Sequence, residues 1–193
     1  MSRDNAGAMA TRKPPKVPGL THFFDRLVRL ALGDLRLPVE GIADYLAGLL
    51  ARFARTDQLY AIRDQAGRRV DSVTGLLLEA ERAWAFEAPD FDPFRERALR
   101  QHVGDYALFM TGIFREHVER SRSVGFYLSE GRRAYQAVAD FERSALHAEA
   151  RLFSALATGF EHYAGALGYL KRVYLRPATG PSALAPVLQL LGE

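Results

Sequence analysis

Three residues near the middle of the chain carry side chains that together can do acid–base chemistry: His102, Asp105 and Tyr106. On a helix, Asp105 lies one turn after His102 and on the same face. A histidine beside an acid and a tyrosine can polarise a bound ligand or move a proton. Because Leu99 and Phe109 belong to the same apolar stripe, we expect this histidine at the edge of the core. It can instead be structural, donating to Asp105 or to a backbone carbonyl.

A second acid, Glu149, interrupts a run of apolar residues that recurs every seven positions from Leu146 to Tyr174. In this pattern Glu149 takes a position that faces the packing partner, as Tyr163 does farther along. A buried carboxylate is costly unless it is paired, hydrogen-bonded or protonated. Three interpretations stay open: an ion pair with an arginine of a neighbouring helix, an acid that faces a ligand inside the bundle, or a seam that is frayed or exposed at this position.

The elements that must position these residues are helices, because apolar residues recur with the helical period and no run alternates as a strand does. The sequence predicts an all-α helical bundle of six to seven helices with one long C-terminal helix, over about 145–175. A disordered basic tail is expected over 1–17, and a single α-helical domain over 18–193. The expected helices run over about 24–35, 38–53, 57–67, 70–84, 93–120, 127–141 and 145–175, with a short tail helix over 184–191.

Composition and missing motifs exclude several kinds of site. The chain has no cysteine, so disulfides, cysteine-ligated zinc and a cysteine nucleophile are excluded. No Glu-x-x-His, His-Glu-x-x-His, P-loop, dinucleotide-binding or Gly-x-Ser-x-Gly motif occurs, so we expect no metal and no cofactor. With a net charge of +3 and interspersed acids, nucleic-acid binding is not favoured. No membrane span is expected, because Glu161 and His162 interrupt the most apolar window.

The segment from Arg97 to His102 resembles the Arg-x(4–6)-His motif of helical RNases of the HEPN type, and Arg95 lies six intervening residues before the same histidine. The resemblance implies that an arginine and this histidine act together on a scissile RNA phosphate. The family tends to place Asn, Asp or His directly after the arginine, whereas Ala98 and Glu96 stand there in this chain. The run VGDYALFMTGIF is similar to runs in bacterial helical proteins and implies no activity.

Function is expected from the width of the apolar face over 145–175, which is apolar or small at four of every seven positions and can pack on both sides. We expect a non-enzymatic, cytoplasmic interaction or scaffolding protein that forms a homo-oligomer or docks on a protein partner. The alternative is a binder of a small apolar ligand, or an enzyme, with a pocket inside the bundle. RNA cleavage is a third hypothesis. The residues expected at such a pocket are His102, Asp105, Tyr106, Glu149 and Tyr163.

Overall fold

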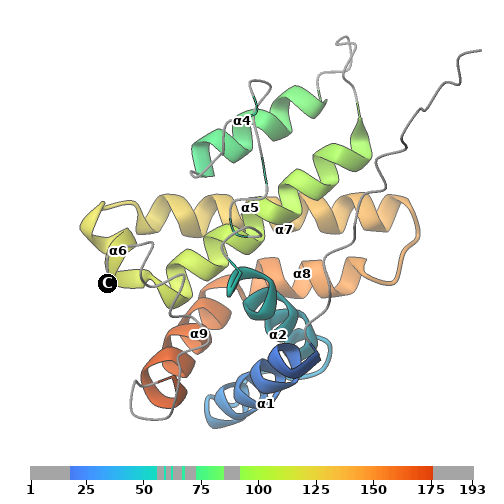
Figure 1. The fold of residues 1–193 in the computed structure, drawn as a ribbon. Coiled ribbons are helices and arrows are strands. Elements are labelled where there is room, and N and C mark those ends of the chain that lie inside the picture. The colour runs from blue at the N-terminus through green and yellow to red at the C-terminus, as the bar shows by residue number, and fades with distance from the viewer. Residues whose placement is uncertain are drawn as a thin grey trace, which may run out of the picture.

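The computed structural model describes residues 18–55, 59, 62, 67, 73–84 and 92–175. Within these ranges the chain forms eight helices and no strand (Figure 1), which confirms the predicted all-α class. No described helix is long and apolar enough to cross a bilayer. The helices are α1 (Pro18–Asp34), α2 (Ile42–Phe53), α4 (Val73–Trp84), α5 (Pro93–Ile113), α6 (Arg115–Arg120), α7 (Val124–Ser144), α8 (Ala150–Thr158) and α9 (Phe160–Tyr174).

Several predicted features lie outside the described residues. These are the tail over 1–17, most of the short helix over 57–67, the first residues of the helix over 70–84, and the tail helix over 184–191.

Helix α5 is the centre of the bundle and packs against α4, α7 and α9 (Figure 1). All residues from Val103 to Ile113 are buried, as expected for a helix that is mostly apolar or small on every side. Asp92 caps its start: the side-chain oxygen accepts hydrogen bonds from the backbone N–H groups of Phe94 and Arg95, both at 3.0 Å. The start of this helix at Asp92–Pro93 is therefore confirmed.

Two glycines let the neighbours of α5 approach its backbone closely. A Cβ atom added at Gly104 would lie 2.5 Å from the Tyr135 ring of α7, and one added at Gly112 would lie 2.6 Å from Cβ of Leu167 in α9. Real Cβ atoms do not come this close to another heavy atom, so a larger residue would push the helices apart. These positions let α7 and α9 pack directly on α5.

Replacing Gly112 with alanine is therefore expected to lower the free energy of unfolding by about 1–2 kcal/mol. Overpacking costs about 1–3 kcal/mol, which outweighs the gain of up to about 1 kcal/mol in helix propensity. Gly165 in α9 is the matched control, because its added Cβ meets nothing within 4 Å and Gly165→Ala should stabilise the fold. Urea unfolding of both variants measures whether the free energy of unfolding falls in Gly112→Ala and rises in Gly165→Ala. Stabilisation by both substitutions would contradict the close packing at Gly112.

The single helix predicted over 145–175 is wrong, because the segment forms α8 and α9 with a break at Gly159. Leu146, predicted inside this helix, has a φ of 58° and lies in the turn after α7. Glycine is a poor helix former, and a residue with positive φ cannot continue a right-handed helix. The sevenfold repeat nevertheless persists, because α8 and α9 face the same core through Phe153 and Phe160.

Two other predicted boundaries are also wrong. The second helix begins at Ile42 rather than at Pro38, because Gly41 has a φ of 70° directly before it. The helix expected to reach Arg120 is divided at Phe114, whose φ of −114° and ψ of 34° separate α5 from α6. Both differences arise where one residue leaves the helical region of backbone dihedrals.

Candidate functional site

The Asp105 carboxylate is a buried polar centre, with only 4% of the residue exposed. Its Oδ1 accepts hydrogen bonds from the hydroxyl groups of Tyr45 in α2, at 2.5 Å, and of Tyr135 in α7, at 2.8 Å. Its Oδ2 accepts one from the guanidinium group of Arg52 in α2, at 2.7 Å. One carboxylate therefore joins α2, α5 and α7. A buried carboxylate is tolerated when it accepts hydrogen bonds from charged or well-aligned donors.

Burial raises the pKa of both tyrosines that donate to Asp105, and the negative charge of the carboxylate raises it further. A phenol with a raised pKa keeps its proton at neutral pH. Tyr45 and Tyr135 therefore act as permanent hydrogen-bond donors here and not as bases.

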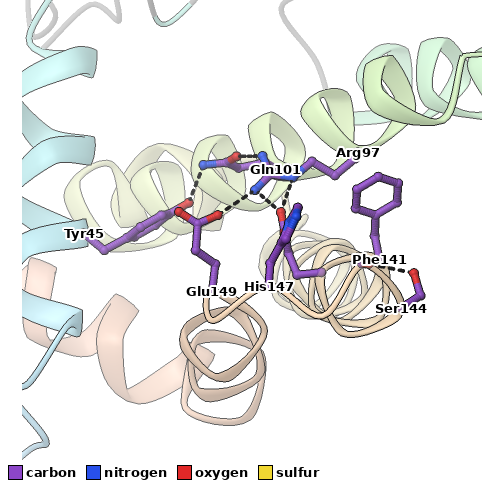
Figure 2. Close-up of polar contacts among 8 residues, drawn as sticks. Tyr45, Arg97, Gln101, Phe141, Ser144, His147 and Glu149 are labelled. Atoms are coloured by element: carbon purple, nitrogen blue, oxygen red, sulfur yellow. Dashed lines mark hydrogen bonds and ion pairs between the residues drawn. The ribbon is translucent and has the colours of Figure 1, made fainter.

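Glu142 in α7 is a second buried carboxylate, with 2% of the residue exposed. Its Oε1 accepts from Arg97 of α5, with Nε at 2.7 Å and Nη2 at 2.5 Å. Its Oε2 lies 2.6 Å from Nδ1 of His147, which follows α7 (Figure 2). Burial alone would raise the pKa of Glu142, but the hydrogen bonds from His147 and Arg97 outweigh it and hold the pKa below its usual value.

Gln101 connects the two carboxylate centres. Its side-chain oxygen accepts a hydrogen bond from Arg97, and its Nε2 donates to the Tyr45 hydroxyl at 3.2 Å (Figure 2). Arg97, Gln101 and Asp105 recur every four residues, so they form one polar stripe along α5. We call the connected set the polar network; its members are Tyr45, Arg52, Arg97, Gln101, Asp105, Tyr135, Glu142 and His147.

His102 does not join this network, although the sequence placed it beside Asp105. Its ring lies 5.6 Å from the ring of Phe53 and makes a hydrogen bond with the backbone of Leu59. Burial lowers the pKa of His102, so the ring is neutral at neutral pH. Its Nε2 atom is buried and has no hydrogen-bond partner among the described residues.

The two tyrosines predicted to line a pocket are both buried at 4% exposure. The ring of Tyr106 lies 6.4 Å from that of Tyr127 in α7. Tyr163 packs against Gly159 at the break between α8 and α9, and burial raises its pKa.

Glu149 does not face the core as its place in the repeat predicted, and of the three interpretations the exposed seam is the one that the structure bears out. The residue directly precedes α8, and 63% of its side chain is exposed. The reason is the chain break described above, which removes Glu149 from any continuous helix face. Its predicted arginine partner does exist: Arg97 Nη2 lies 3.6 Å from the carboxylate (Figure 2).

Six members of the polar network were missed in the sequence analysis: Tyr45, Arg52, Gln101, Tyr135, Glu142 and His147. Tyr45 looked like an ordinary core residue of the second helix. Glu142, however, lies four residues after Val138 on the apolar stripe of α7, so its burial could have been predicted. Arg52 carried no local signal, because its partner lies 53 residues away in the sequence.

The polar network holds helices together through its two buried carboxylates. All four oxygens of Asp105 and Glu142 have a donor from another residue. No group of three His, Asp or Glu side chains that could hold a metal ion occurs in the part of the chain that the structure describes. Arg97 and His102, the pair in the RNase-like motif, have different partners and belong to separate contacts.

The most unusual surface residue is Leu146, in the turn that follows α7. The backbone N–H of Leu146 donates to Arg143 O at 3.1 Å, and that of His147 donates to Glu142 O at 2.8 Å. This is a Schellman motif, whose left-handed position is usually glycine. Here that position is a leucine with a φ of 58° and 92% of its surface exposed.

Comparisons with protein-family models, with curated proteins and with solved structures gave no match to this chain. The fold and the site define the class of protein by themselves: it is an all-α bundle with a buried polar network and with an exposed leucine in the turn after α7.

Proposed function

We propose that this chain is a non-enzymatic, cytoplasmic interaction protein that self-associates through the turn around Leu146. The main support for this proposal is that Leu146 has a left-handed backbone conformation and that its side chain lies almost wholly in solvent. The left-handed conformation costs a non-glycine residue about 1–2 kcal/mol. When a residue adopts an unfavourable backbone conformation and its side chain makes no stabilising contact within the same molecule, that residue is a candidate for a functional role.

The turn around Leu146 is rigidly held, which suits a contact surface. His147 is tied to Glu142, and Glu142 to Arg97 of α5. The polar network thus fixes the backbone on the C-terminal side of Leu146 to the centre of the bundle. A pre-organised apolar anchor loses little conformational entropy on binding.

Leu146→Gly tests this proposal. At concentrations where the protein is monomeric, the variant should be more stable by about 0.5–1 kcal/mol, because glycine adopts positive φ without strain. In sedimentation velocity at higher concentrations, it should lose the self-association of the wild type.

The matched control is Arg122→Gly. Arg122 occupies the same position of a Schellman motif after α6, with a φ of 54°, so this variant should gain stability and keep self-association. Equal association of Leu146→Gly and wild type would contradict the proposal.

A second candidate function is small-molecule binding near His102. It is favoured by the buried Nε2 atom, which has no partner among the described residues, since such atoms are usually satisfied by a ligand, an ion or water. Native mass spectrometry separates the two candidates. A monomer with extra mass that is lost on denaturation, and lost in His102→Leu, would favour this one.

A further inference from the structure

A surface groove lies beside the Leu146 turn, between the end of α7 and the outer face of α8. It has a volume of about 420 Å³, which is more than one leucine side chain occupies. Two alanines form its apolar part, and its remaining sides are cationic or hydroxyl-bearing. The lining residues are Arg143, Ala150, Arg151, Ser154, Ala155 and Thr158.

We infer that this groove is the receptor for Leu146 of a second copy of the chain, so that two copies exchange leucines in a symmetric dimer. The inference rests on the proposed self-association and specifies which surfaces of the two copies meet. Leu146 lies three residues after Arg143 and four before Ala150, so it belongs to the turn that joins the two segments lining the groove.

Symmetry explains why a second copy fits better than an unrelated partner. In a two-fold dimer each surface patch meets itself, so the patch must contain both the protruding group and its receptor. A leucine and a groove on separate surfaces would instead make a head-to-tail contact, which builds a ring or an open chain of molecules. Their adjacency favours a closed pair.

Charge gives a second argument for self-complementarity. Arg151 lines the groove and has no ion-pair partner among the described residues. Glu149, three residues after Leu146, exposes 63% of its side chain while its carboxylate lies 3.6 Å from Arg97 Nη2, so it can also face a second cation. When Leu146 enters the groove of the other copy, Glu149 follows it toward a cationic wall, and the same contact recurs in the opposite direction.

Filling the groove tests the inference. Ala155 is exposed on α8, so Ala155→Trp should leave the thermal midpoint unchanged while it raises the dimer Kd at least about tenfold, the effect of losing about 1.4 kcal/mol. Thr74→Trp, an exposed substitution on α4, is the control and should dimerise as the wild type does.

Mixing the variants gives the sharper test. Leu146→Gly lacks the leucine but keeps the groove, and Ala155→Trp keeps the leucine but lacks the groove. Each should be monomeric alone, whereas an equimolar mixture should form heterodimers through the one intact contact. Likewise, Arg151→Glu should weaken dimerisation, and the double variant with Glu149→Arg should restore it.

Each failure has a distinct meaning. If Leu146→Gly is monomeric but Ala155→Trp dimerises like the wild type, the groove is not the receptor and only this inference is overturned. If the wild type itself is monomeric at every concentration, the proposed self-association fails and this inference fails with it. Absence of heterodimers in the mixture, with each variant monomeric alone, also overturns the exchanged-leucine geometry.

Discussion

Replacing Asp105 with leucine is expected to lower the free energy of unfolding by about 3–5 kcal/mol, the range found when a buried ion pair loses one partner. The variant leaves the Tyr135 hydroxyl buried with its acceptor removed, and it also removes the acceptor of Tyr45. Each buried hydroxyl without a partner costs about 1–3 kcal/mol. Loss of the Arg52 ion pair contributes less to this cost, because 42% of the Arg52 side chain is exposed and its guanidinium group can be hydrated instead. Urea unfolding followed by circular dichroism at pH 7 measures the loss.

Two control variants should lower the free energy of unfolding by less than Asp105→Leu does. Asp105→Asn keeps an oxygen acceptor for the tyrosines and should cost less than the leucine variant. Glu119→Gln breaks an exposed ion pair with Arg115, in which about half of each side chain is exposed, and should cost no more than about 1 kcal/mol. If Asp105→Leu costs no more than Glu119→Gln, the carboxylate does not hold the three helices together.

Replacing Arg97 with alanine is expected to cost about 2–3 kcal/mol at pH 7. The buried Glu142 carboxylate then keeps only His147 as a partner, which places the loss below the full range of about 3–5 kcal/mol for an unpaired buried charge. The pKa of Glu142 should rise in the variant, because burial still raises it while one of the two groups that lower it, Arg97, has been removed.

The pH dependence of the Arg97→Ala effect has a definite sign. In the wild type the folded pKa of Glu142 lies below its unfolded value of about 4.3–4.5. Its contribution to stability is therefore complete above that value and is lost as the pH falls through the lower, folded pKa. The difference between variant and wild type should shrink in this acid range. A difference that stays constant from pH 7 to the acid range would show that Arg97 acts by packing and not through Glu142. Arg133→Ala removes an arginine whose side chain is 76% exposed; it is the control and should have little effect at any pH.

Local chemistry made parts of the fold predictable. The helical class follows from the period of apolar residues, and the start of α5 follows from an Asp–Pro pair whose capping role needs no tertiary contact. The long helix over 145–175 failed for a physical reason. A sevenfold repeat reports which residues face the core, and two helices that face one core preserve it across a break at Gly159.

The candidate site was predictable only where its residues follow one another along a helix. Asp105 was singled out because it lies one helical turn after His102, but its observed partners come from α2 and α7. The identity of those partners depends on how α2 and α7 cross α5, which no pattern in the sequence states. Leu146 could not be found in advance, because its left-handed backbone is visible only in the structure.

Sedimentation velocity of the wild-type chain over a wide range of concentration tests the central claim most directly. We expect a reversible shift from the 21.5 kDa mass of one chain to twice that mass as the concentration rises. A single species at the mass of one chain, at every concentration, would contradict self-association through the turn around Leu146.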